Sequence, residues 1–140
     1  MRVVFHMTPN GNQEQRCWDK WAELAERLVG EHDVTIYVVG GRKDSLEVLP
    51  FLVKTDYLGN RVKNLVGQTT LDQLIALVRS CDLLVCVNSF VMHLGVALGV
   101  KMFAIVGATE PKVVLPPGIP HAYSLYARDI PLETVLEGIR

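Results

Sequence analysis

The sequence predicts an α/β fold, with a single Rossmann-like, doubly wound parallel sheet and helices on both faces. Three observations predict it. Short apolar runs alternate along the chain with segments of helical period. Two of these runs, Leu83–Val87 and Met102–Val106, are apolar throughout, as in strands that helices cover on both sides. Between them lies the nearly all-apolar segment Val91–Leu98, which completes a βαβ unit.

The first part of the chain predicts strand, helix and strand in turn. Arg2–His6 is an apolar run typical of a strand. A helix follows, closed by Gly30, because apolar residues recur on one face at helical spacing: Trp18, Trp21, Leu24, Ala25 and Leu28. Val34–Val39 is the second strand. The next stretch stays undecided, because Leu46, Leu49 and Phe51 suit one side of a helix that Pro50 would interrupt.

The clearest helix signal lies in the middle of the chain. Lys63–Val66 predicts a short third strand, and Thr70 with Gln73 forms a capping-box pattern that opens a helix. The apolar side of this helix is expected to contain Leu71, Leu74, Ile75 and Val78. After the βαβ unit, where Gly99 suits a left-handed C-terminal cap, the last helix is predicted at 132–139, opened by Pro131.

Length and composition set limits on organisation and partners. The 140 residues suit one domain, expected to span 1–140, and 49% hydrophobic residues are enough to build a core. With 14 basic and 15 acidic side chains, the net charge of −1 gives no attraction toward nucleic acid. The three cysteines, Cys17, Cys81 and Cys86, lack Cys-x-x-Cys spacing, so we expect buried thiols, with no disulfide framework and no zinc site.

The sequence favours a cytoplasmic protein. Met1–Met7 lacks the hydrophobic region and the cleavage site of a signal peptide. The apolar stretch Leu83–Val100 is about as long as a membrane span, but it contains Asn88, Ser89 and His93. We therefore interpret it as a strand and a helix and expect no transmembrane segment.

Candidate binding residues follow the strands, since ligands of such sheets bind beyond the carboxyl ends of the strands. The predicted strands are followed by 8–12, Gly40-Gly41, Gly67-Gln68-Thr69-Thr70, Asn88-Ser89-Phe90 and Gly107-Ala108-Thr109-Glu110. These small, polar and glycine-bearing loops suit a phosphate-bearing ligand, with Arg16 or Lys112 to neutralise its charge. Ordinary turn chemistry explains the same composition. The dinucleotide, P-loop and His-Glu-x-x-His motifs are absent.

Five motifs keep a common order and spacing along the chain. They are Arg16-Cys17-Trp18 with Trp21-x-x-Leu24-Ala25-x-x-Leu28, Val38-Val39-Gly40-Gly41, Leu65-Val66-Gly67-Gln68-Thr69-Thr70-Leu71-x-x-Leu74, Asn88-Ser89-x-x-Met92-His93-Leu94-x-x-Ala97-Leu98-Gly99, and Val106-Gly107-Ala108-Thr109. This series resembles the C-terminal half of glycosyltransferase family 9, the heptosyltransferases of the lipopolysaccharide inner core. The resemblance covers residues 3–139.

The resemblance implies one half of a two-domain GT-B architecture, the half that binds the nucleotide sugar, with an inverting, metal-independent reaction and no cofactor. The acceptor site and the catalytic base would belong to the other half. That half would be a separate chain or another part of a longer enzyme, and a second copy of this chain would replace it only partly. The catalytic residues of this chain are therefore unknown. By resemblance and position, the residues expected at an ADP-heptose-type ligand are Thr8, Arg16, Gly67, Thr69, Asn88, Ser89, Phe90, His93, Gly107 and Thr109.

Two residues depart from the family's Asp-Ser/Thr-Gly-x-x-His signature. Asn88 replaces a carboxylate and carries neither charge nor useful basicity. Phe90 replaces a glycine and adds bulk where backbone N–H groups would approach a phosphate. With the acceptor half missing, this chain is expected not to transfer sugar alone. The alternative function is a non-catalytic descendant that binds a protein partner or another small ligand.

Several of these residues also have a purely structural interpretation. His93 suits a core histidine on an apolar helix as well as a ligand contact. Arg16 suits a solvated charge, and Thr69 and Thr70 suit helix caps. Trp18 and Trp21 are expected in the core and not at a base-stacking surface.

Overall fold

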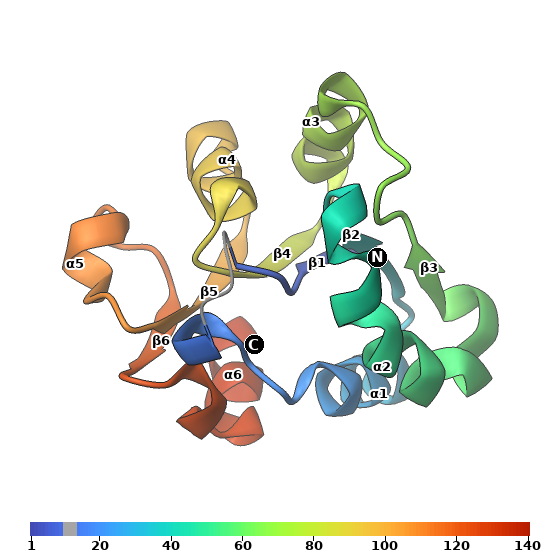
Figure 1. The fold of residues 1–140 in the computed structure, drawn as a ribbon, viewed down its shortest axis with the longest axis horizontal. Helices are drawn as coiled ribbons and strands as arrows, with labels where there is room; N and C mark the ends of the chain where they lie inside the picture. The colour runs from blue at the N-terminus through green and yellow to red at the C-terminus, as the bar shows by residue number, and fades with distance from the viewer. Residues whose placement is uncertain (10–13) are drawn as a thin grey trace.

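Six parallel strands form one sheet in the computed structural model, which describes residues 1–9 and 14–140. The strands are β1 (Arg2–His6), β2 (Thr35–Val39), β3 (Val62–Asn64), β4 (Leu83–Val87), β5 (Met102–Gly107) and β6 (His121–Ser124). The helices are α1 (Trp21–Glu31), α2 (Ser45–Thr55), α3 (Leu71–Ser80), α4 (Phe90–Leu98), α5 (Pro111–Val114) and α6 (Leu132–Ile139). The strand order is β3-β2-β1-β4-β5-β6, so the predicted doubly wound α/β class is confirmed (Figure 1).

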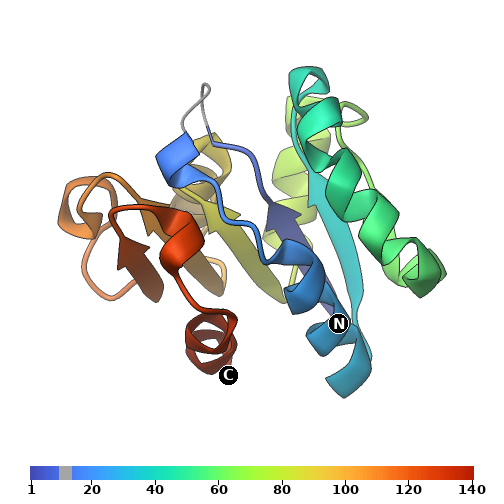
Figure 2. The same cartoon turned by 60° about the horizontal axis from the view of Figure 1, so that its bottom comes forward.

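Helices cover both faces of the sheet. Helices α3 and α4 lie on one side of the strands, while α1 and α6 lie on the other (Figure 1) and come forward in Figure 2. Neighbouring residues of β1 alternate between the two layers, because successive side chains of a strand point to opposite faces. Val3 and Phe5 belong to the core under α1, α2 and α6, whereas Val4 belongs to the core under α3 and α4.

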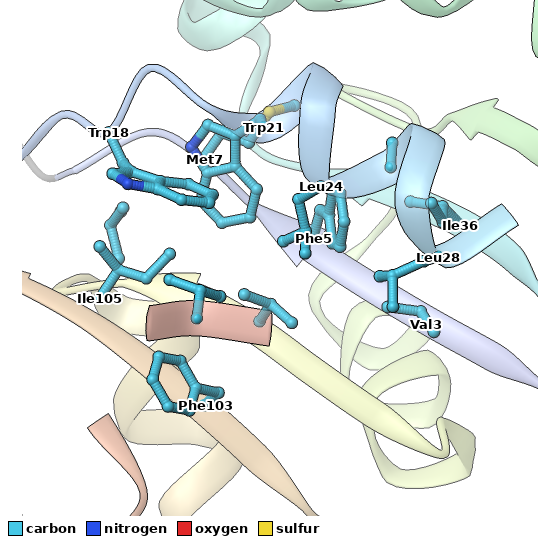
Figure 3. Close-up of a cluster of buried hydrophobic side chains, with 14 of the residues drawn as sticks. Val3, Phe5, Met7, Trp18, Trp21, Leu24, Leu28, Ile36, Phe103 and Ile105 are labelled. Carbon is cyan, nitrogen blue, oxygen red and sulfur yellow. The ribbon is translucent and has the colours of Figure 1, made fainter. Parts of the chain in front are cut away.

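Aromatic rings fill the core beneath α1. The Phe5 ring lies 5.0 Å from the Trp21 ring, and the Trp18 ring meets Trp21 edge-on at 5.2 Å between centroids (Figure 3). The indole N–H of Trp18 donates to the carbonyl of Ile130 at 2.9 Å, which satisfies its polar atom inside the core. Both tryptophans are buried, so their predicted place in the core is confirmed.

The chain reverses its winding direction at β1. From β1 it builds outward through β2 and β3, then returns to place β4 on the other side of β1 and continues through β5 to β6. The crossovers therefore leave in opposite directions at the adjacent carboxyl ends of β1 and β4. Open α/β sheets bind their ligands at such a switch point.

Helix boundaries near α1 differ from the prediction. Trp18 precedes α1, in the segment after a 3-10 turn at Glu14–Arg16, and the helix starts at Trp21. Gly30 lies within α1, and the helix ends beside His32 in extended conformation. The prediction of Gly30 as the closing residue was wrong because this exposed glycine meets no steric obstacle to a helical conformation.

The undecided segment is the helix α2, with Pro50 inside it. Its buried side consists of Val48, Phe51 and Thr55, whereas Leu46 and Leu49 are exposed. Phe51 packs 6.2 Å from the Phe5 ring, which stabilises a helix that proline alone would disfavour. Of the three residues that suggested one apolar side, at 46, 49 and 51, only Phe51 is buried.

The capping box of α3 is confirmed. Thr70 Oγ1 accepts a hydrogen bond from the Gln73 amide at 3.1 Å, and Gln73 Oε1 accepts one from the Thr70 amide at 2.9 Å. Leu71 is 58% exposed and does not share the buried side of the helix, because it lies in the first turn at the carboxyl edge of the sheet. In α4, Gly99 adopts the predicted left-handed cap with a φ of 67°.

The C-terminal part contains two elements that the sequence did not indicate, the short helix α5 and the edge strand β6. The third strand is also shorter than predicted, ending at Asn64. The apolar stretch at 83–100 forms β4 and α4, as predicted. Within the described part of the chain, no helix has the length and apolar character needed to cross a membrane.

Candidate functional site

Buried polar side chains gather at the carboxyl ends of β1 and β4. His6 and Thr8 end β1 and the segment after it, while Asn88 and Ser89 follow β4 directly. The other buried polar or charged residues of the described chain are Asp44, which follows β2, and Thr55, which donates to the Phe51 carbonyl within α2. Because burying polar groups is costly, their concentration at the switch point marks this edge as the candidate site.

A hydrogen bond joins the two strand ends. Ser89 Oγ lies 2.9 Å from His6 Nδ1 and also donates to the Val87 carbonyl at 3.0 Å. Burial lowers the pKa of His6 to about 4, against the opposing effect of the Asp44 carboxylate. The ring is therefore neutral near pH 7.

A pocket of about 220 Å³ opens beside this pair. Its walls come from the ends of β1 and β2 and from the first turns of α3 and α4. The lining residues are His6, Thr8, Pro9, Gly40, Gly41, Lys43, Asp44, Thr69, Thr70, Leu71, Leu74, Phe90 and Val91. Three predicted site residues, Thr8, Thr69 and Phe90, thus line one pocket. The Phe90 side chain is 50% exposed, so it borders the pocket without filling the core.

Thr8 carries a polar atom that the fold leaves unsatisfied. Its side chain is only 5% exposed, and its Oγ1 has no hydrogen-bond partner among residues 1–9 and 14–140. Buried hydroxyl groups without a partner are uncommon, because the loss of hydration is not compensated. Thr8 lines both this pocket and a larger cavity between α1 and α2, so a ligand in either space would supply the missing partner.

Arg16, Thr109 and Gly107 form a second group of predicted residues. The Arg16 Nη2 donates to Thr109 Oγ1 at 3.3 Å, and the buried Arg16 Nε has no partner within the described chain. A Cβ on Gly107 would lie 2.0 Å from the Gln15 carbonyl oxygen. Glycine at 107 is therefore what lets the segment carrying Arg16 cross the end of β5. A solvated-charge interpretation of Arg16 does not fit this geometry.

Two further predicted residues have structural explanations. Gly67 has a φ of 72°, and a Cβ there would lie 2.9 Å from Arg42 Cγ. Its amide donates to the Gly40 carbonyl at 2.8 Å, which holds the loop before Thr69 against the end of β2. Asn88 is buried beside Ser89 and does not line the pocket.

The structure does not bring His93 to the pocket. His93 is exposed on α4, so its interpretation as a core histidine was wrong. It lines none of the cavities found in the described residues. Residues 10–12, which belong to the predicted loop after β1, lie outside the described residues.

A larger cavity, of about 640 Å³, lies between α1, α2 and the segment before α1. Its lining includes three carboxylates and one ammonium group, from Glu14, Asp19, Glu47 and Lys54. This charge would repel a diphosphate. A third cavity, of about 550 Å³, lies beside α5 and β6. Glu110 and Lys112 border it as an exposed ion pair at 3.3 Å. The pocket at the switch point is therefore the better candidate for an anionic ligand.

Two of the expectations from the sequence concern metal ligands and thiols. No cluster of three or more His, Cys, Asp and Glu side chains in 1–9 and 14–140 is arranged to hold a metal ion. Cys86 is buried, and burial raises the pKa of its thiol. Cys17 and Cys81 are half-buried, which corrects the expectation of three buried thiols.

Sequence reasoning missed three titratable residues of the pocket, His6, Lys43 and Asp44. His6 is the last residue of β1 and follows three apolar residues, and the sequence analysis treated it as part of that run. Asp44 ends a 3-10 turn that begins at Arg42, and its Oδ2 accepts from the Gly41 amide at 2.9 Å. A polar residue exactly at the end of a central strand was the available signal for His6.

Comparison with known proteins identifies a family that this chain matches. The model of glycosyltransferase family 9 (heptosyltransferase) matches residues 2–124. Lipopolysaccharide heptosyltransferase 2 of Escherichia coli is 32% identical over 99 residues, which are 69% of this chain and 28% of that protein. Lipooligosaccharide heptosyltransferase 2 of Campylobacter jejuni is 32% identical over 97 residues, covering 66% of this chain and 30% of that protein.

Solved structures share the fold over nearly the whole chain. The structure of E. coli ADP-heptose lipopolysaccharide heptosyltransferase II superposes with a TM-score of 0.86 at 25% identity, covering 99% of this chain and 45% of that one. E. coli heptosyltransferase WaaC with ADP gives a TM-score of 0.77 at 16% identity, covering 98% and 42%, and shows the fold alone. The chain thus spans less than a third of its curated relatives and less than half of these structures.

Proposed function

The chain belongs to glycosyltransferase family 9, and from that premise we propose that it binds a nucleotide-diphosphate sugar of the ADP-heptose type as a donor-binding domain, 1–140. The observation that carries the proposal is the pocket at the switch point, where the buried Thr8 hydroxyl has no partner among the described residues. A solved relative with ADP-2-deoxy-2-fluoro heptose shares this fold, which supports the choice of ligand class.

The ligand would extend along the carboxyl edge of the sheet. A pocket of about 220 Å³ accommodates only part of a nucleotide sugar, since sites for ligands of this size usually exceed about 300 Å³. We assign the remainder to the groups beyond β4 and β5, where Arg16 and Thr109 lie. Arg16 would neutralise diphosphate charge, and the first turn of α4 would offer backbone N–H groups. Three other predicted residues would contribute less directly. His93 would lie at the edge of the bound ligand, and the backbone conformation at Gly67 and Gly107 would shape the site.

In this proposal sugar transfer requires groups that this chain does not supply. A general base and an acceptor must lie within hydrogen-bond reach of the reacting carbon. A separate acceptor-binding chain, or another part of a longer enzyme, would supply them. The protein would act in lipopolysaccharide assembly, in the cytoplasm.

The second candidate function is a non-catalytic ligand- or protein-binding domain. Asn88 and Phe90 favour it, because Asn88 removes a charge of the family's signature and Phe90 places a half-exposed ring beside the pocket. Phe90 lines the pocket, whereas Asn88 lies buried beside Ser89.

Titration of the purified chain with ADP, UDP, GDP and an ADP-sugar, followed by thermal shift and calorimetry, separates the two functions. A ligand at 100 times its Kd stabilises a fold by about 2.7 kcal/mol. We expect a shift with ADP and with the ADP-sugar. Failure of every nucleotide to shift the unfolding transition at millimolar concentration would overturn the donor-binding proposal in favour of the second candidate.

A further inference from the structure

The hydrogen bonds around Ser89 determine which nitrogen of His6 carries the proton. The Ser89 hydroxyl has one proton, which it donates to the Val87 carbonyl. The contact of 2.9 Å between Ser89 Oγ and His6 Nδ1 then requires Nδ1–H to be the donor. In the neutral ring, the other nitrogen, Nε2, has no proton and can only accept a hydrogen bond.

The His6 side chain lines the pocket at the switch point. Nε2 has no hydrogen-bond partner within the described chain, and it is not among the fully enclosed polar atoms that lack one. The residue as a whole is 6% exposed. Of the three cavities described above, His6 lines the pocket at the switch point and neither of the others.

The neighbouring group on this wall is also an acceptor. The Asp44 carboxylate lines the same pocket and has one oxygen bonded to the Gly41 amide. Burial lowers the pKa of His6, so the ring stays neutral at physiological pH. Two acceptors on this part of the wall attract donors such as sugar hydroxyls, while Lys43, which lines the same pocket, supplies a positive charge for an anionic group of the ligand.

Resting on the proposed function, we propose that His6 is a specificity-determining residue whose Nε2 accepts a hydrogen bond from a hydroxyl of the ligand's sugar, either the ribose or the sugar to be transferred. The wall formed by His6 and Asp44 thereby selects a polyol and leaves the diphosphate to the edge near Arg16.

Two substitutions separate the two nitrogens of the ring. His6→Asn places an amide N–H where Nδ1 lies, so it can keep the bond to Ser89 but lacks any group at the position of Nε2. His6→Gln places its amide near the position of Nε2 and loses the bond to Ser89. If His6 served only the fold, His6→Asn, which can keep the bond to Ser89, would be closer to the wild type than His6→Gln in both stability and ligand binding.

Calorimetric titrations of the wild-type chain and both variants with ADP, ADP-glucose and inorganic pyrophosphate test the proposal. We expect His6→Asn to weaken ADP-glucose binding about tenfold and to leave pyrophosphate binding unchanged, while His6→Gln binds ADP-glucose within about threefold of wild type. Equal weakening of ADP assigns the hydroxyl to the ribose, and unchanged ADP binding assigns it to the transferred sugar. Unchanged ADP-glucose binding by His6→Asn, or an equal loss for pyrophosphate, would overturn the proposal.

A spectroscopic measurement distinguishes failure of this inference from failure of the proposed function. The ¹⁵N shifts of the His6 ring in the ligand-free chain should show protonated Nδ1 and unprotonated Nε2 at pH 7, and a protonated Nε2 would overturn the inference. If wild-type chain with the expected ring state binds no nucleotide, the proposed function itself fails. If wild type binds nucleotides and His6→Asn binds them equally well, only the role of His6 fails.

Discussion

The middle of β1 is apolar and sealed, whereas its carboxyl end carries buried polar side chains. Val3, Val4 and Phe5 are fully buried and pack against helices on both faces. One residue further, His6 begins a polar group that Thr8 continues. Strand β4 repeats this contrast, with an apolar body followed by Asn88 and Ser89. Packing explains the bodies of these strands, but it does not explain polar groups with unsatisfied atoms, which point to binding.

The largest expected effect lies in the strand body. Phe5→Ala should destabilise the fold by about 3–5 kcal/mol, because it removes a fully buried ring that packs on Trp21 and Phe51. Chemical unfolding of the variant and the wild type measures this loss. A loss below about 1 kcal/mol would mean that the core can collapse around the missing ring. It would weaken the contrast between the packed body of β1 and its polar carboxyl end.

The next effect lies at the strand end and depends on pH. The pKa of His6 falls from an ordinary value near 6.5 to about 4 in the fold. The unfolded chain therefore binds this proton first as the pH falls, so the stability that the neutral ring contributes is complete above about pH 6.5 and is lost toward pH 4. The loss should reach about 3 kcal/mol.

Comparison with His6→Asn isolates this contribution. The free energy of unfolding of both chains, measured between pH 4 and pH 8, should show an additional slope in the wild type below pH 6.5, whereas carboxylates affect both chains equally. Parallel curves would show that the ring is accessible to protonation in the folded protein.

The double substitution Asn88→Asp with Phe90→Gly sharpens the comparison at the end of β4. It restores the family's signature and lets backbone N–H groups approach a phosphate, so ADP binding should tighten by about 1 kcal/mol, or several-fold. Calorimetry measures the change, with Phe90→Leu as the control that keeps the bulk. If the double variant binds ADP no more tightly than the wild type, the nucleotide does not lie where the family's signature would place it.

The smallest expected change in stability comes from Thr8→Val. Removing a buried hydroxyl without a partner should leave stability unchanged or raise it by up to about 1 kcal/mol. The same substitution should weaken ADP binding, because the ligand loses its contact. Loss of stability without loss of affinity, in unfolding and titration experiments, would show that Thr8 serves the fold.

The sequence predicted the strands at the centre of the sheet better than the elements at its edges. Continuous apolar runs identify β4 and β5 because both of their faces are buried. The edge strand β6 has one buried residue, Ala122, and gives no such pattern. Helix α2 was undecided because Pro50 opposes a helix locally, while the packing of Val48 and Phe51 is decided only in the folded protein.

The candidate site was predicted in part for a similar reason. Loops after strands are identifiable from sequence, and Thr8, Thr69 and Phe90 indeed line one pocket. The distance between Arg16 and Thr109 depends on the chain crossing β5 at Gly107, which no local pattern encodes. His93 is the opposite case. It matches the family motif in the sequence, but it lies on an exposed face of α4 and does not line the pocket.

In the proposed function the carboxyl ends of β1 and β4 hold the nucleotide, and an ADP titration followed by amide chemical shifts in NMR locates the bound ligand. We expect the largest shifts at His6, Thr69, Ser89 and Phe90, with little change in the bodies of β1 and β4. Largest shifts around Trp18 and Glu47, in the acidic cavity between α1 and α2, would contradict it.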